Sequence, residues 1–211
     1  MKIIEAFAVK NKCYQAGVPL TPRGIMLHSV GTPQPSAAVF ARSFNQYQPG
    51  GVSVCVHAFA QADGTVYQTL PWEMRGWHCG GSANSTHIGV EMTEPSAGMT
   101  RSEAAEQIAG TYRTVVELFA ELCKQYELDP AQDGVIIGHA EGHRRGVASN
   151  HADPELLWRT YDMGYTMDGF RRDVAEAMKN GAREEALDMP RYDSVAEMPQ
   201  WARAGVQRLI D

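Results

Sequence analysis

The pattern of hydrophobic and polar positions along the chain predicts a set of short strands. Each run of apolar or β-branched residues is brief and is bounded by turn-forming residues, which is typical of strands in a buried sheet. His28 ends the first run, GIMLH, and the Asp63-Gly64 pair between the second and third runs is a strong hairpin signal. The predicted strands are residues 24–28, 52–59, 65–69, 87–92 and 135–137.

Two amphipathic helices follow from the same pattern. Thr100, with Glu103 three residues later, forms a capping box at the start of the first helix. Apolar residues then recur with a period close to 3.6 as far as Tyr126, so one face of this helix must pack on a sheet. A second helix is predicted over residues 166–178. The expected fold class is α/β, with a single central mixed β-sheet flanked by α-helices.

The character of the sequence changes near its C-terminal end, which predicts the domain organisation. A length of 211 residues fits one main domain, which we assign to residues 1–180. Residues 181–191, which contain Pro190, are expected to be a linker. Residues 192–211 have a short amphipathic pattern that is expected to be helical but is too short to fold alone.

Composition and charge narrow the choice of partners. The chain has 25 acidic residues against 19 lysines and arginines, so nucleic acid and anionic membrane surfaces are poor partners. The first residues lack the apolar stretch of a secretory signal, and no run approaches the roughly 20 apolar residues of a spanning helix. We therefore expect a protein made in the cytoplasm, with no evident obligate protein partner. The four cysteines lie far apart and are expected to be free thiols.

The densest group of chemically active side chains lies in residues 138–154, GHAEGHRRGVASNHADP. This loop follows a predicted strand, and loops on rigid scaffolds are where metal ligands and catalytic groups concentrate. Imidazole nitrogen and carboxylate oxygen suit zinc, and a catalytic zinc ion typically has three protein ligands. Spacing alone leaves open which side chains of the loop bind: the candidates are His139, His143, His151 and Asp153.

Five stretches of the chain are similar, in the same order, to the motifs of one enzyme family. They are GIMLHSVG (24–31), VHAFAQADGTVYQTLP (56–71), GWHCGG (76–81), HIGVEM (87–92) and GHAEGHRRGVASNHADP (138–154). Together they resemble the type 2 N-acetylmuramoyl-L-alanine amidases, zinc enzymes that share their fold with peptidoglycan recognition proteins. The resemblance implies hydrolysis of the amide bond between N-acetylmuramic acid and L-alanine in bacterial peptidoglycan.

The resemblance also implies a Zn²⁺ site and two catalytic residues. In that family the first zinc ligand ends the first core strand, which matches His28. The second follows a strand in a Gly-His pair, which matches His139, and the third is an aspartate or cysteine later in the same loop, which matches Asp153. Glu91 matches the catalytic glutamate and is expected to act as general base. His151 matches the helper residue that is expected to donate a hydrogen bond to the oxyanion.

A further set of residues is expected to contact the substrate. Trp77 and His78 match the wall-binding stretch of the family, although core packing explains Trp77 equally well. His143 remains the alternative ligand to His139, which we prefer because it follows a strand in a Gly-His pair. The residues expected to bind substrate are His57, Trp77, His78, Glu94 and Asn150.

The alternative function is a module of the same fold that binds peptidoglycan without cutting it. Three filled ligand positions favour the enzyme over this module. The lack of a secretion signal favours a phage or prophage endolysin that reaches the cell wall after release. Residues 192–211 resemble the opening of a helical wall-binding repeat that follows the catalytic domain in such lysins.

Overall fold

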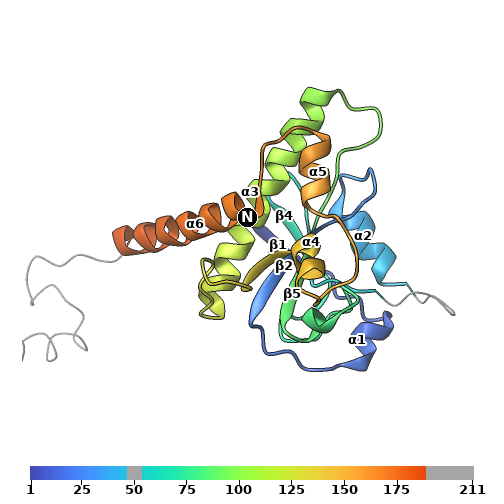
Figure 1. Ribbon diagram of the computed structural model, residues 1–211. Coiled ribbons are helices and arrows are strands. Elements are labelled where there is room, and N and C mark those ends of the chain that lie inside the picture. The colour runs from blue at the N-terminus through green and yellow to red at the C-terminus, as the bar shows by residue number, and fades with distance from the viewer. Residues whose placement is uncertain (47–53, 189–211) are drawn as a thin grey trace, which may run out of the picture. The chain divides into compact units, whose positions relative to one another are not determined.

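A mixed sheet of six strands forms the centre of the fold in the computed structural model, which describes residues 1–46 and 54–188 (Figure 1). Across the sheet the strands are β1 (Lys2–Glu5), β4 (Thr65–Gln68), β3 (Ala58–Ala60), β5 (His87–Met92), β2 (Gly24–Ser29) and β6 (Ile136–Gly138). Strands β3 and β4 are antiparallel, and every other neighbouring pair is parallel. The predicted α/β class with a single mixed sheet is confirmed.

The predicted hairpin is confirmed, but its first strand is shorter than expected. Gly64 has a φ of 84° in the turn, a conformation that glycine adopts without strain. Residues 52 and 53 of the strand expected over residues 52–59 lie outside the described residues, and β3 begins at Ala58, because Cys55 makes a separate backbone bridge to Trp77. The edge strand β1 is not predicted by the sequence pattern, because most of its residues are exposed.

Three helices share the main hydrophobic core with the sheet: α3 (Arg101–Gln125), α5 (Glu155–Thr160) and α6 (Met167–Asp188). Helix α3 confirms the first predicted helix, since Thr100 is its N-cap and forms the capping box with Glu103. Helix α3 contacts β3 and β5 with its apolar face. Fully buried side chains of this core include Ile25, Leu27, Ile88, Ile108, Leu118, Phe119, Trp158 and Phe170.

Helix α6 confirms the second predicted helix but extends past its predicted end. It runs to Asp188, so residues 181–188, expected to belong to a linker, are helical. The alanine, glutamate and leucine residues of this segment are strong helix formers, and the sequence has no proline between Met167 and Pro190. The change in sequence character near Gly181 therefore does not end the helix.

The chain divides into two compact units, Met1–Met178 and Lys179–Asp211. The expected limit of the catalytic domain at residue 180 stays a prediction. The helical segment expected over residues 192–211 and the end of the expected linker lie outside the described residues. Within the described ranges, no helix is long and apolar enough to cross a membrane.

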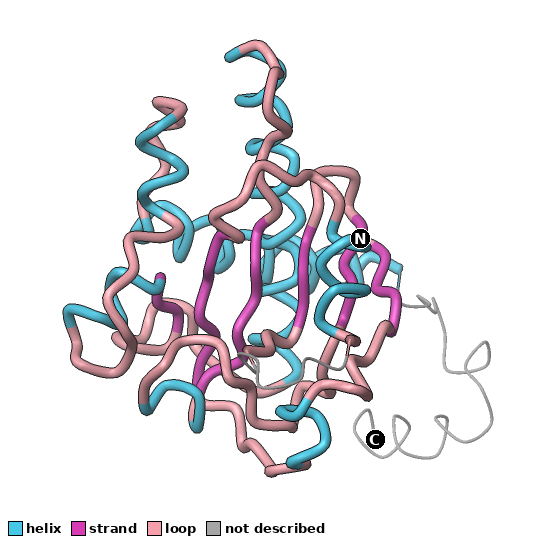
Figure 2. The backbone as a smooth tube through the Cα atoms, turned by 90° about the vertical axis from the view of Figure 1, so that its right-hand side faces the viewer, coloured by secondary structure: helices cyan, strands magenta, loops and turns pink. Residues whose placement is uncertain are grey.

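Figure 2 shows the strands of the sheet side by side, with helices packed against them. The face of the sheet away from the main core carries the residues that matter for function. Its elements are α2 (Ala37–Phe44) and α4 (His139–Arg144), with α1 (Lys12–Ala16) in a small core of its own. Successive side chains of a strand point to opposite faces, so Met26 and His28 lie on this face while their neighbours enter the main core. Gly89 and Glu91 of β5 also lie here, and His28 pairs in register with Glu91.

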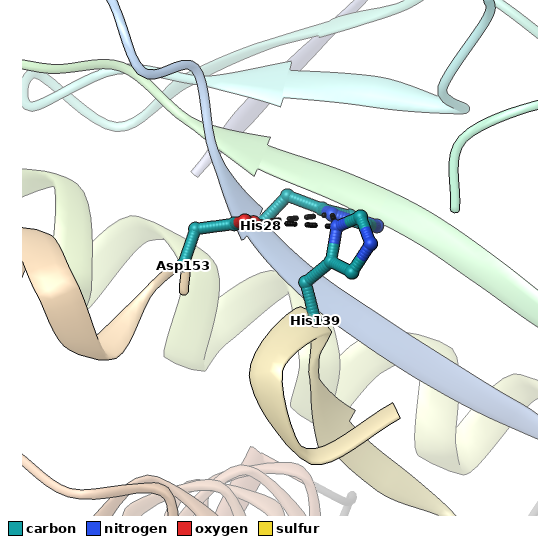
Figure 3. A group of neighbouring side chains, drawn as sticks. All are labelled: His28, His139 and Asp153. Atoms are coloured by element: carbon teal, nitrogen blue, oxygen red, sulfur yellow. Dashed lines mark hydrogen bonds and ion pairs between the residues drawn. The ribbon is translucent and has the colours of Figure 1, made fainter. Parts of the chain in front are cut away.

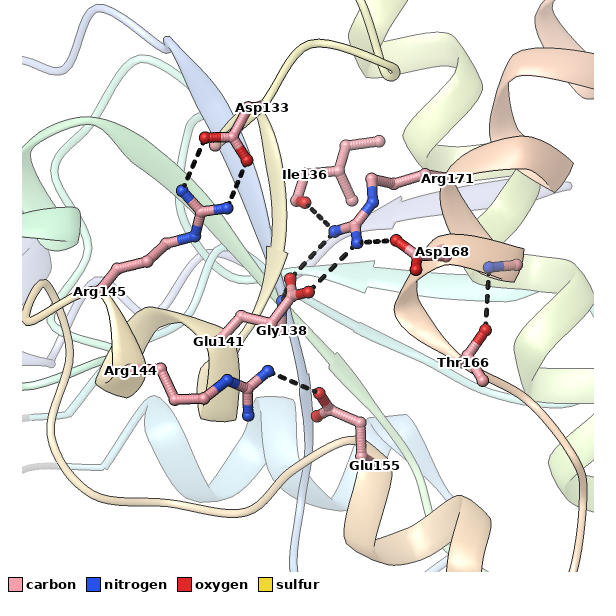
Figure 4. Close-up of polar contacts among 12 residues, drawn as sticks. Asp133, Ile136, Gly138, Glu141, Arg144, Arg145, Glu155, Thr166, Asp168 and Arg171 are labelled. Atoms are coloured by element: carbon pink, nitrogen blue, oxygen red, sulfur yellow. Dashed lines mark hydrogen bonds and ion pairs between the residues drawn. The ribbon is translucent and has the colours of Figure 1, made fainter.

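Arg171 of α6 fastens the edge strand β6 to the first turn of α4 (Figure 4). Its guanidinium donates to the Ile136 carbonyl over 2.9 Å and to the two Glu141 carboxylate oxygens over 3.0 and 3.1 Å. Glu141 also accepts the backbone N–H of Gly138 over 3.3 Å. The network gives the edge-strand carbonyl of Ile136 a hydrogen-bond donor. It also ties Glu141, in the first turn of α4, to helix α6, and this turn begins with His139.

Replacing Arg171 by leucine is expected to lower the free energy of unfolding by about 1–3 kcal/mol, because Glu141 and the Ile136 carbonyl lose a charged donor. Urea denaturation followed by circular dichroism measures the change. Arg172→Leu is the matched control, since Arg172 is exposed on the same helix, and its effect should stay within about 0.5 kcal/mol. If both variants lost the same free energy of unfolding, the effect would come from removing one positive charge, and the hydrogen bonds of Arg171 would have no stabilising role.

Candidate metal centre and active-site cleft

The three side chains predicted as metal ligands converge at one end of the sheet (Figure 3). His28 lies near the end of β2, His139 begins α4 and Asp153 precedes α5, and their donor atoms all lie within 4.8 Å of one another. His28 Nδ1 lies 3.0 Å from His139 Nδ1 and 3.3 Å from Asp153 Oδ2, and His139 Nδ1 lies 3.6 Å from Asp153 Oδ1. The group could hold a metal ion.

The direction of the strands explains why residues so far apart in sequence meet. Strands β2 and β6 are parallel neighbours, so their carboxyl ends lie at the same end of the sheet and bring His28 beside His139. Two backbone contacts fix Asp153: its carbonyl accepts the N–H of Ala140 over 3.1 Å, and its Oδ2 accepts the N–H of Ser29 over 3.3 Å. Strand order therefore assembles the group from three separate elements.

Burial and mutual charge set the protonation of the group. Burial by itself lowers the pKa of His28, but the hydrogen bond with Asp153 and the charge of Glu91 raise it above the ordinary value. Burial, with the charge of His28, lowers the pKa of His139 to about 4. The hydrogen bond from His28 outweighs burial at Asp153 and lowers the pKa of its carboxyl. Near neutral pH the group thus offers a carboxylate and a neutral His139 imidazole.

The carboxylate of Glu91 lies beside this group. It lies opposite His28 in the β5–β2 register, and its Oε2 atom is buried with no hydrogen-bond partner among the described residues. Burial raises the pKa of Glu91 to about 7, with Asp153 and Glu94 adding to the effect and His28 opposing it. A carboxyl poised near neutral pH is suited to accept and return a proton.

His151 lies at the mouth of the site. Its side chain is 60% exposed, and its Nδ1 lies 3.9 Å from Asp153 Oδ1. Its ring stacks on that of His139 with centroids 4.5 Å apart and planes inclined by 9°. The imidazole of His151 can therefore reach a bound substrate while contacting the ligand group.

A cleft of about 590 Å³ contains the ligand group and the carboxylate of Glu91. Glu94, predicted to bind substrate, lines this cleft, and its Oε1 accepts the N–H of Gly31 over 2.8 Å. The cleft also has an apolar wall that includes Leu156, which is 53% exposed. The sequence did not predict this wall, and the only signal for it was an apolar residue three positions after Asp153. Further lining residues include His28, His78, His139, His151, Phe44, Val54 and Tyr161.

The remaining predicted residues fall in different places. Trp77 and His78 line a neighbouring pocket of about 350 Å³ that shares His139 and His151 with the cleft. Asn150 is exposed on the loop and is absent from the described lining of both pockets. 

His143, the alternative metal ligand, is exposed on α4. It stays outside the group of His28, His139 and Asp153. The geometry thus selects His139 from the two candidates that the loop sequence offers.

His57, expected to bind substrate, is buried and does not line either pocket as the described residues form them. Its side chain is 0% exposed, its Nε2–H donates to the Met74 carbonyl over 2.7 Å, and its Nδ1 accepts the N–H of Gly89 over 2.9 Å. Burial lowers the pKa of His57 to about 4, so the ring stays neutral. Both ring nitrogens of His57 therefore form hydrogen bonds with backbone groups, which is a structural role.

The four cysteines are buried free thiols, as expected.

Known proteins similar to this chain give its family and its fold. The family model of N-acetylmuramoyl-L-alanine amidases matches residues 18–156, more than half of the 211-residue chain. The fold is similar to that of the hydrolase AmiA of Staphylococcus aureus, solved with its ligand, with a TM-score of 0.65 and 22% identity over 86% of each chain. A mutant endolysin from Bacillus subtilis has a TM-score of 0.58 and 21% identity, over 82% of this chain and 99% of that one. No curated protein sequence matches the chain.

The mixed sheet, with a cleft at the carboxyl ends of its parallel strands, gives this protein the α/β fold of these similar amidase and endolysin structures. The chain belongs to the N-acetylmuramoyl-L-alanine amidase family and is an enzyme of that class. The resemblance to this amidase family seen in the five motifs is therefore confirmed.

In the metal-free protein, the raised pKa of Glu91 predicts a pH-dependent stability difference from the Glu91→Gln variant. The folded protein keeps the Glu91 proton up to about pH 7, whereas the unfolded chain releases it near the ordinary pKa of 4.5. Wild type therefore loses stability relative to the variant as pH rises through this window, and the difference reaches about 1–3 kcal/mol above pH 7. Urea denaturation with a chelator, repeated over a pH series, measures it. A difference that does not change with pH would contradict the raised pKa.

Proposed function

We propose that this protein is a zinc-dependent amidase that cleaves the bond between N-acetylmuramic acid and L-alanine in bacterial peptidoglycan, and that it lyses cell walls as an endolysin does. The observation that supports this proposal most is the convergence of His28, His139 and Asp153 beside the buried carboxylate of Glu91 in one cleft. Membership of the amidase family supports the substrate.

The donor set fits a zinc ion. Two imidazole nitrogens and one carboxylate are ligands that zinc prefers, and three protein ligands leave a fourth position free for chemistry. Zinc bonds of about 2.0–2.1 Å in tetrahedral geometry separate the donors by about 3.3 Å. The distances of 3.0, 3.3 and 3.6 Å among the donor atoms of His28, His139 and Asp153 agree with this spacing. A bound zinc ion supplies Lewis acidity, which polarises an amide carbonyl and acidifies water.

Glu91 is the proposed general base and acid. Its buried Oε2 has no hydrogen-bond partner in the described part of the chain, so the carboxylate can accept a proton from the attacking water. It can then return that proton to the nitrogen of the leaving L-alanine. A pKa of about 7 makes both transfers feasible near neutral pH.

His151 is the proposed hydrogen-bond donor to the oxyanion. Its exposed imidazole reaches into the cleft and is held by stacking on the ring of His139. A donor already in place when negative charge develops on the carbonyl oxygen contributes a few kcal/mol of stabilisation. The apolar wall around Leu156 and Tyr161 would pack against the sugar and the stem peptide.

Replacing Glu91 by glutamine should keep the zinc and lower the turnover rate by about 10²–10⁴-fold, because the proton carrier is lost. New amino-terminal alanine released from purified peptidoglycan reports the rate, and metal analysis reports about one zinc per chain. Glu106→Gln, an exposed change on α3, is the control and should leave both unchanged. Wild-type protein that binds zinc and peptidoglycan but releases no new amine would be a binding module, and the proposal would fail.

Replacing His151 by alanine should lower kcat by about 10²–10³-fold with little change in KM, because the lost hydrogen bond forms mainly in the transition state. Steady-state kinetics on solubilised wall fragments separate the two constants. His143→Ala removes an exposed histidine outside the ligand group and should have kinetics like wild type. A loss expressed only in KM would assign His151 to substrate binding instead.

A further inference from the structure

His78, expected from the sequence to bind the cell wall, and its neighbour Cys79 are linked to the outer nitrogens of the two ligand histidines, directly for His28 and through Ser149 for His139. His28 Nε2 lies 2.9 Å from His78 Nδ1. His139 Nε2 lies 3.2 Å from Ser149 Oγ, and this hydroxyl in turn donates to the Cys79 carbonyl over 3.0 Å. The hydrogen-bond chain from His28 thus ends at His78, and the chain from His139 ends at the adjacent residue, Cys79.

The first chain determines which nitrogen of His28 carries the proton. His78 Nε2 lies 3.1 Å from the carbonyl oxygen of His87, and a carbonyl can only accept, so His78 Nε2 is the donor. The neutral imidazole of His78 then presents a lone pair at Nδ1. The neutral ring of His28 must therefore carry its single proton on Nε2 and donate it to that lone pair, which leaves Nδ1 of the neutral ring unprotonated and directed at Asp153 and His139.

The second chain gives the same result for His139. The Ser149 hydroxyl has a single proton, which it gives to the Cys79 carbonyl, so its oxygen accepts from His139 Nε2–H. His139 Nδ1 is then the free nitrogen, and it faces His28 Nδ1 over 3.0 Å. Both histidines therefore present the same nitrogen to the centre of the group.

The segment that receives both chains is itself held firmly. Asn84 is 8% exposed and lies in the 3-10 turn Ser82–Ser85, and its Oδ1 accepts the N–H groups of His78 and Cys79 over 2.9 and 3.0 Å. Gly89 of β5 leaves room for the ring of His78, because a Cβ at this position would lie 2.4 Å from His78 Cγ. Packing and hydrogen bonds thus leave His78 little freedom to turn.

We propose that His78 and Ser149 are positioning residues that hold His28 and His139 as Nε2–H tautomers with Nδ1 free to bind zinc, and that Asn84 anchors both through the His78–Cys79 backbone. This inference rests on the proposed zinc site. It reassigns His78 from wall binding to support of the metal ligands. Outer partners of ligand histidines typically contribute about 10–100-fold to metal affinity, because they fix the tautomer and the ring orientation.

The test compares the dissociation constant for zinc, measured by competition with a chromophoric chelator, between wild type and matched variants of the full chain. His78→Leu and Ser149→Ala should each weaken zinc binding by about 10–100-fold. His78→Asn should restore most of the affinity, because its Oδ1 takes the place of the Nδ1 acceptor, and Ser149→Thr should do so because it keeps a hydroxyl. Unchanged affinity in His78→Leu, or no recovery in His78→Asn, would overturn the proposal.

His57→Leu is the control for a merely structural effect. It also removes a fully buried imidazole beside His78, but neither nitrogen of His57 bonds to a ligand histidine. Thermal denaturation of the zinc-free variants should show losses of stability in both His57→Leu and His78→Leu, whereas zinc affinity should fall only in the second. An equal fall in zinc affinity in both would reduce His78 to a packing residue.

A measurement on wild-type protein needs no substitution. Nitrogen-15 chemical shifts of the imidazole rings at alkaline pH should show His28 and His139 protonated at Nε2, both with and without zinc. The opposite tautomer in either ring would overturn the proposal. If wild type bound no zinc but showed both tautomers, the zinc-dependent function would fail while the positioning roles of His78 and Ser149 would stand.

Discussion

The parallel pairing of β2 with β5 is the constraint on which the site depends. The register places His28 opposite Glu91, and the two-residue period of a strand puts both on the face away from the main core. A slip of one residue would turn one of these side chains into the apolar core and remove it from the cleft. Gly89 belongs to the same constraint, since its missing side chain makes the space for His78. Backbone pairing thus determines which side chains can meet before any contact within the cleft forms.

The burial that assembles the group also gives it its chemical properties. A carboxylate with a buried, unpaired oxygen at Glu91 costs stability, and so do two imidazole nitrogens that face each other at 3.0 Å. A bound ligand can offset the cost of such contacts. A cation between His28, His139 and Asp153 would do so, because it would attract the facing nitrogens and the carboxylate. The same desolvation brings the pKa of Glu91 to about 7, where a proton can move in both directions. Features that weaken the fold are therefore the ones that suit the proposed reaction.

Support for the ligands comes from residues outside the ligand group itself. Arg171 holds the turn in which α4 begins, and that turn starts with His139. Asn84 fixes the backbone of His78 and Cys79, which accept the hydrogen-bond chains from both histidines. Sharing one backbone segment between two ligands makes their orientations depend on each other. The rigidity of the site follows from this shared support.

Local signals in the sequence determined the hairpin, the capped helix α3 and the α/β class, because alternation, capping and turn chemistry act over a few neighbouring residues. The ordered motifs also pointed to His28, His139, Asp153, Glu91 and His151. Tertiary structure alone decided between similar histidines, since the direction of a ring depends on strands and loops that are distant in sequence. It buried His57 between backbone segments, left His143 exposed, and turned His78 toward His28. A histidine's identity can be read from the chain, but its partners exist only after the sheet has formed.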